Sequence, residues 1–131
     1  MKTLSSILLT LLVVFGACTS PRISSDPFVR VSDGRLTVNG KPYYYIGTNF
    51  WYGAILGSQG QGGNRERLLR ELDHLKAHGI NNLRVLVGAD GKDGIPTKAE
   101  PALQIEAGVY NDTIFDGLDY FLSELGKRDM Y

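Results

Sequence analysis

Residues 64–87, NRERLLRELDHLKAHGINNLRVLV, place an amphipathic helix directly before a short apolar strand. Asn64 is a good helix N-cap, and Gly79 is expected to end the helix in a left-handed conformation. The residues at 82–88 then have the composition of a buried parallel strand. Alternating helices and parallel strands define α/β folds, which is the fold class that this stretch predicts. The leucines expected on the buried face of the helix are Leu68, Leu72 and Leu75.

The same alternation extends along the chain in both directions. Residues 44–51 predict a strand before the helix, and the glycine-rich residues 53–63 predict a loop between the two. Residues 89–111 predict a long loop, and residues 112–126 predict a second amphipathic helix. Residues 130–131 would open a third strand, so the sequence predicts two βα units. The expected apolar face of the second helix consists of Ile114, Leu118, Phe121, Leu122 and Leu125.

Residues 28–45 alternate between apolar and polar side chains and contain two turn signals. Asp33-Gly34 and Asn39-Gly40 each suit the positive backbone torsions of a tight hairpin turn. We therefore expect a small β-hairpin or meander before the first βα unit. Three consecutive tyrosines, residues 43–45, alternate between the two faces of a strand, so we interpret them as packing residues.

The first 18 residues predict an export signal. Lys2 precedes an apolar run at residues 4–15 that is too short to cross a bilayer, which requires about 20 apolar residues. Small residues lead into Cys18, the single cysteine, as in the signal of a bacterial lipoprotein. Lipid attachment at Cys18 would place the protein at the outer membrane or cell surface, and plain secretion is the alternative. The polar residues 19–27 are expected to form a linker.

The composition excludes several classes of function. Fourteen basic residues balance fourteen acidic residues, so there is no electrostatic signature of a nucleic-acid-binding protein, and a neutral substrate fits better. His74 and His78 lie four residues apart on the first helix, but the glutamate of a zinc-protease motif and a third ligand are missing. The glycines of residues 53–63 lack the spacing of a dinucleotide-binding loop. We therefore expect neither a metal nor an organic cofactor.

Side chains that suggest chemistry occur at the strand ends. Asn49 and Trp51 share one face of the first strand, because side chains alternate with a period of two. Trp51 and Tyr52 follow that strand, where flat rings can stack on sugars, although Trp51 is also suited to plugging an interior. Asn49 is equally suited to binding a hydroxyl group or to joining the strand ends. Arg84 lies opposite the aliphatic face of the second strand, so it should point inward and need a carboxylate partner.

Three segments together resemble the start of a family 5 glycoside hydrolase. They are Gly47-Thr48-Asn49-Phe50-Trp51, Asn82-Leu83-Arg84-Val85, and Leu103 to Asp112 with the helix behind it. The third segment is most similar to endo-acting β-mannanases. The resemblance implies that residues 28–131 form the N-terminal portion of a catalytic (β/α)8 barrel. Because such a barrel needs about 250 residues, we expect a fragment that reaches strand three and that is inactive and poorly folded on its own.

The resemblance also implies a function for the full-length protein, which would be a monomer. That function is the retaining hydrolysis of β-1,4-mannosidic bonds within mannans. The two catalytic glutamates would lie beyond residue 131, so no catalytic residue is assigned here. Arg84 matches the arginine that supports the nucleophile, and Asn49, Trp51 and Tyr52 are the expected substrate-binding residues. An endoglucanase of the same family and a lipid-anchored glycan-binding protein without activity remain alternatives.

Overall fold

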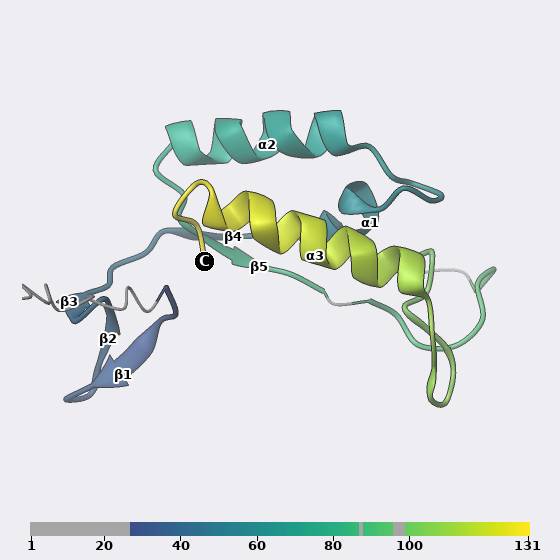
Figure 1. The fold of residues 1–131 in the computed structure, drawn as a ribbon, viewed down its shortest axis with the longest axis horizontal. Coiled ribbons are helices and arrows are strands. Elements are labelled where there is room, and N and C mark those ends of the chain that lie inside the picture. The colour runs from purple at the N-terminus through teal and green to yellow at the C-terminus, as the bar shows by residue number, and fades with distance from the viewer. Residues whose placement is uncertain (1–26, 87, 96–98) are drawn as a thin grey trace, which may run out of the picture.

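The computed structural model describes residues 27–86, 88–95 and 99–131 (Figure 1). The predicted export signal, Cys18 and all of the linker except Pro27 lie outside these residues. Helices and strands alternate after an N-terminal β-meander, in agreement with the predicted α/β class. No helix within the described ranges is long and apolar enough to cross a membrane.

The meander consists of β1 (Arg30–Ser32), β2 (Arg35–Val38) and β3 (Lys41–Pro42), paired antiparallel in that order. Both connections are tight turns in which two consecutive residues have positive φ angles. Asp33 and Gly34 have φ angles of 50° and 71°. These torsions are the ones that a two-residue hairpin turn requires, so the predicted meander is confirmed.

The three tyrosines after the meander have different environments. The Tyr43 ring stacks on Tyr45 with centroids 5.8 Å apart, and it meets the Tyr131 ring edge-on at 5.0 Å. Tyr44, in contrast, is 82% exposed. The interpretation as packing residues is therefore right for Tyr43 and wrong for Tyr44, because the backbone alternation turns Tyr44 away from its neighbours.

A parallel pair of strands forms the centre of the fold. Strand β4 (Gly47–Asn49) pairs with β5 (Asn82–Arg84), and the backbone of Tyr131 continues the pairing on the other side of β5. Tyr131 N–H donates to Asn81 O at 2.9 Å, and Tyr131 O accepts from Leu83 N–H at 2.7 Å. This is the hydrogen-bond pattern of a third parallel strand. Both strands are shorter than predicted, because the ladder ends where a partner strand ends.

A short helix, α1 (Gly53–Gly57), occupies part of the segment for which a loop was predicted. The loop prediction is therefore wrong for residues 53–57 and right for residues 58–63, which form no helix or strand. Within α1 the glycines serve close approach between elements and not loop conformation. A Cβ atom at Gly53 would lie 2.8 Å from the Phe121 ring, and one at Gly57 would lie 2.2 Å from Gly117 O. Only glycine permits backbone contacts this close.

Helix α2 (Arg65–Ala77) begins and ends as predicted. The Asn64 side chain accepts a hydrogen bond from Arg67 N–H at 2.9 Å, which caps the first turn. Gly79 has a φ angle of 79°, and Ile80 N–H donates to Leu75 O at 3.1 Å in the manner of a left-handed C-cap.

The segment after β5 is more ordered than the predicted long loop. Strands β6 (Gln104–Glu106) and β7 (Val109–Tyr110) form an antiparallel hairpin in its second half. Gly108 supplies a positive φ angle of 77° in the turn. This hairpin was missed because its strands are only three and two residues long, too short for alternation to stand out.

Helix α3 (Asp112–Gly126) differs from the prediction in the face that it buries. Ile114, Phe121 and Leu125 are buried as expected, but Leu122 is 51% exposed. Gly117 is buried instead, because α3 lies against α1 and the contact leaves no room for a side chain. The buried face is therefore rotated from Leu122 toward Gly117.

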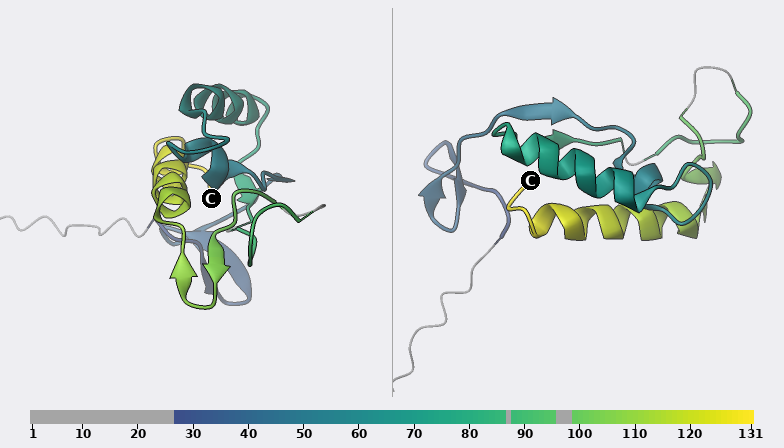
Figure 2. Two further views of the ribbon diagram at one scale, coloured as in Figure 1. Left: turned by 90° about the vertical axis from the view of Figure 1, so that its right-hand side faces the viewer. Right: turned by 90° about the horizontal axis from the view of Figure 1, so that it is seen from above.

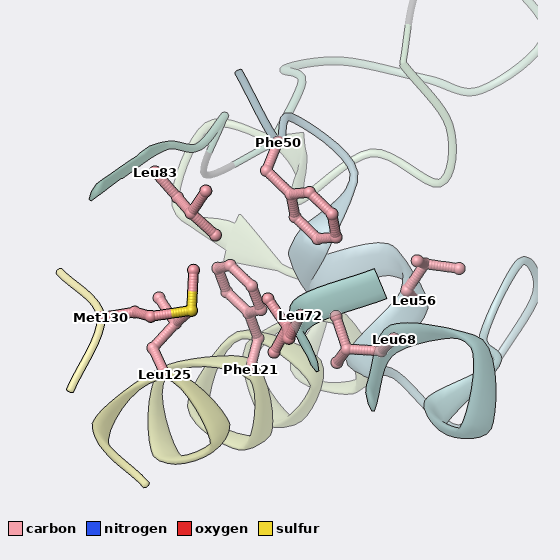
Figure 3. Close-up of a cluster of buried hydrophobic side chains, with 8 residues drawn as sticks. All are labelled: Phe50, Leu56, Leu68, Leu72, Leu83, Phe121, Leu125 and Met130. Carbon is pink, nitrogen blue, oxygen red and sulfur yellow. The ribbon is translucent and has the colours of Figure 1, made fainter. Parts of the chain in front are cut away.

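Helices α1, α2 and α3 lie on one side of β4 and β5 (Figure 2). They surround the larger of two apolar clusters in the described part of the chain (Figure 3). Phe121 lies at its centre, fully buried, with its ring stacked on Phe50 at 5.6 Å. The opposite face of β4 and β5 carries exposed side chains, so the helices cover one face only. The buried members of the cluster are Phe50, Leu56, Leu68, Leu72, Leu83, Phe121, Leu125 and Met130.

A charged network joins the two long helices. The Arg128 guanidinium donates to Asp73 of α2 at 2.7 Å and to Glu124 of α3 at 2.8 Å. The Glu124 side chain is only 7% exposed, and hydrogen bonds from Lys127 and Arg128 lower its pKa although burial opposes this shift. Glu124 therefore stays ionised in the fold, which sequence periodicity alone did not predict.

We expect Gly117→Ala to lower the stability of the full-length protein, measured by urea denaturation. The added Cβ would lie 2.2 Å from Ala54 O, and a backbone atom cannot move aside without separating the helices. Overpacking of this kind costs about 1–3 kcal/mol of unfolding free energy. Gly126→Ala is the control, because its Cβ would meet no atom within 4 Å and alanine favours the helix. Equal effects of both substitutions would contradict the close contact.

Candidate functional site

The open face of β4 and β5 brings together three of the residues expected at the site. Asn49 and Arg84 are opposite each other in the parallel register, and Arg84 Nη1 donates to Asn49 Oδ1 across 3.4 Å. Trp51, two residues after Asn49, is 47% exposed. The neighbouring residue Phe50 points into the apolar cluster, so strand alternation directs Asn49 and Trp51 to the opposite face.

Arg84 is exposed in the described part of the chain. The carboxylate that we expect beside it belongs to the part of the barrel beyond residue 131, so the ion pair stays a prediction. Within the described ranges, the only side chain that accepts a hydrogen bond from Arg84 is that of Asn49. The physical reason is that no described residue covers the face of the sheet on which Arg84 lies. This single long hydrogen bond to a neutral amide leaves most of the five N–H donors of the Arg84 guanidinium available.

Tyr52 lies away from the open face. Its hydroxyl donates to Glu71 Oε2 of α2 at 2.8 Å, and its ring packs against Phe50 with centroids 4.5 Å apart. It meets the Trp51 ring edge-on at 5.3 Å. The expected substrate-binding residues are therefore separated, with Asn49 and Trp51 on one side of the strand end and Tyr52 on the helix side.

The contacts between Tyr52 and α2 determine the charge states of Tyr52 and Glu71. Burial raises the pKa of Glu71, but hydrogen bonds from Arg67 and Tyr52, together with the positive charge of Arg67, outweigh it and lower the pKa overall. Burial and the hydrogen bond to Glu71 raise the pKa of Tyr52. At neutral pH the pair is therefore an ionised carboxylate and a neutral phenol that donates to it.

The acidic residues of the segment after β5 have structural partners that sequence analysis missed. Asp93 Oδ1 accepts from Ala102 N–H at 2.8 Å, and Asp90 Oδ1 accepts from the Gln104 side chain at 3.3 Å. These bonds join the first half of the segment to its second half. No group of three metal-ligating side chains occurs among the described residues.

Two parallel strands, each followed by a helix on one face and by polar or aromatic side chains at its carboxyl end, are the arrangement of βα-type enzymes. Comparisons with known proteins identify the family. The model of the GH family 5 beta-mannosidase-like family matches residues 26–131. The chain belongs to this glycoside hydrolase family.

Individual relatives agree with this assignment. The chain is 35% identical over 100 residues to "Mannan endo-1,4-beta-mannosidase 1" of Oryza sativa, covering 76% of this chain and 21% of that protein. The family 5 mannosidase of Rhizomucor miehei superposes with a TM-score of 0.76 at 35% identity, covering 82% of this chain and 26% of that one. A second structure of that mannosidase, an alanine variant in complex with mannosyl-fructose, superposes equally well, with the same coverage. The chain thus spans about a quarter of the length of these relatives.

Proposed function

We propose that the full-length protein hydrolyses β-1,4-mannosidic bonds within mannans, and that residues 28–131 form the first two βα units of its (β/α)8 barrel. The observation that carries this proposal is the 35% identity to a mannan endo-1,4-beta-mannosidase over 76% of the chain. The parallel βα arrangement supports the barrel, since its open face would line the barrel interior once further strands close the sheet.

The reaction we propose uses two carboxyl groups about 5–5.5 Å apart, as in retaining glycosidases. One attacks the sugar carbon, while the other protonates the leaving oxygen and then activates water. Neither is assigned to a residue of this chain. Arg84 would face them from the interior of the barrel, where its positive charge would keep the nucleophile ionised.

The open face also suits the substrate. Mannan is neutral, and the exposed ring of Trp51 offers a flat apolar surface on which a sugar ring can stack. The Asn49 amide, next to Trp51 on the same face, can hydrogen-bond a sugar hydroxyl. We propose these two residues as the substrate contacts of this chain, in a monomer that requires no metal or cofactor for the reaction.

The test of the function is an assay of the full-length protein on soluble mannan and on carboxymethylcellulose. We expect the viscosity of mannan to fall well before free mannose accumulates, because an endo-acting enzyme cuts within the chain, and we expect no effect on the cellulose derivative. Mannose as the early main product would show an exo-acting mannosidase instead. Preferential cutting of cellulose, or binding of mannan without cleavage, would overturn the proposal.

The role of Arg84 predicts that Arg84→Ala lowers kcat about a hundredfold, the effect of a misplaced catalytic group, while the melting temperature changes little. Arg84→Lys keeps the charge but loses the planar fork, so it should recover only part of the activity. Arg35→Ala removes an exposed arginine from the meander and serves as the control. Near-normal turnover of Arg84→Ala would exclude the proposed role.

We further propose that the protein is exported and carries a lipid on Cys18. The support is the sequence of the first 18 residues, with a basic start, a short apolar run and small residues before the cysteine. In a bacterial host, the wild-type protein should fractionate with membranes and incorporate labelled palmitate. Cys18→Ala should abolish labelling and release the protein from the membranes. Unlabelled, soluble wild-type protein would favour plain secretion.

A further inference from the structure

Tyr52 connects the exposed end of β4 to helix α2. It follows Trp51 directly, yet its hydroxyl donates to Glu71 Oε2 at 2.8 Å. Glu71 is itself held by Arg67, whose Nε lies 2.6 Å from Glu71 Oε1. A chain of hydrogen bonds therefore runs from the first turn of α2 to the residue next to the exposed tryptophan.

The Tyr52 ring is held on several sides. Phe50 of the apolar cluster packs against it at 4.5 Å, and the Arg67 guanidinium lies 5.5 Å from its centroid. The hydrogen bond from the hydroxyl to Glu71 restrains both the position and the rotation of the ring. Tyr52 thus has more restraints than the half-exposed Trp51 beside it.

Trp51 depends on this neighbour for its orientation. Among the described residues, Tyr52 makes the only ring contact of Trp51, with centroids 5.3 Å apart and planes at 85°. Such an edge-to-face arrangement is favourable and depends on angle, so a fixed Tyr52 favours one orientation of the indole. A ring that is already oriented loses less conformational entropy when a ligand binds to it.

We propose that Glu71 and Tyr52 are positioning residues, which hold the Trp51 ring in the orientation that stacks on a sugar of the substrate. This inference rests on the proposed function and goes beyond it, because it places a determinant of substrate affinity on the outer helix α2. It also gives Tyr52 a role different from direct contact with substrate. The Glu71 side chain would act without touching the sugar.

The first experiment measures KM and kcat of the full-length protein on soluble mannan. Glu71→Ala removes the acceptor for Tyr52, and we expect KM to rise about two- to tenfold with kcat unchanged, the size of one lost aromatic contact. Glu71→Gln retains an acceptor oxygen and should restore KM. Glu66→Ala breaks the comparable pair with Arg70 on the same helix, also at 2.6 Å, and should change neither constant.

A double substitution tests whether the effect passes through Trp51. Trp51→Ala should raise KM at least as much as Glu71→Ala, and the double variant should be no worse than Trp51→Ala alone. A raised KM in Trp51→Ala with normal KM in Glu71→Ala would overturn the positioning role and leave the proposed function intact. Additive effects would also overturn it, because Glu71 would then act independently of the indole.

A measurement without substrate separates this inference from the proposed function. Protein labelled with 5-fluorotryptophan is examined by fluorine NMR, and the resonance missing in Trp51→Phe belongs to Trp51. We expect Glu71→Ala and Tyr52→Phe to shift or broaden that resonance, and Glu66→Ala to leave it unchanged. An unchanged resonance in Glu71→Ala would overturn the positioning role, whether or not the protein cleaves mannan.

Discussion

The burial of Phe50 against Phe121 is the contact on which the rest of this structure depends. This contact directs the Phe50 side chain into the apolar cluster that the helices cover. Because side chains alternate along the chain, Asn49 and Trp51 then point to the uncovered face. A Cβ atom at Gly53 would lie 2.8 Å from the same Phe121 ring, so this ring also limits how closely α1 can approach α3. The composition of the open face of β4 and β5 therefore follows from packing on the opposite face. Phe50 and Phe121, which lie away from the open face, determine which side chains reach it.

The regular features of the fold were predictable because they follow from local rules. The leucine spacing of α2, the Asn64 cap, the Gly79 end and the meander turns each depend on a few adjacent residues. Helix α1 was missed because glycines at close contacts look the same in sequence as glycines in loops. The exposed Leu122 was missed because the buried face of α3 is set by its contact with α1, which is not local information.

In the candidate site, too, the features that follow from local rules were predictable, and those that depend on distant elements were not. Alternation placed Asn49 and Arg84 on the same face, and the structure has them side by side there, with an exposed Trp51 in the turn after β4. The environment of Arg84 was not predictable from its strand, because burial depends on whatever covers that face. The hydrogen bond that turns Tyr52 toward α2 was not predictable, because its acceptor, Glu71, is 19 residues away on another element. A strand-end aromatic residue looks the same in sequence whether it faces a ligand or a helix.

The bridge from Arg128 to Asp73 and Glu124 has a consequence for how relatives of this chain diverge. Glu124 and Arg128 are the members removed from water, with side chains 7% and 15% exposed, whereas Asp73 is 66% exposed. An unpaired charge costs more when it is buried, so Glu124 and Arg128 constrain each other more than either constrains Asp73. Natural variation at positions 124 and 128 should consequently be concerted, while position 73 varies more freely among descendants of a common ancestor.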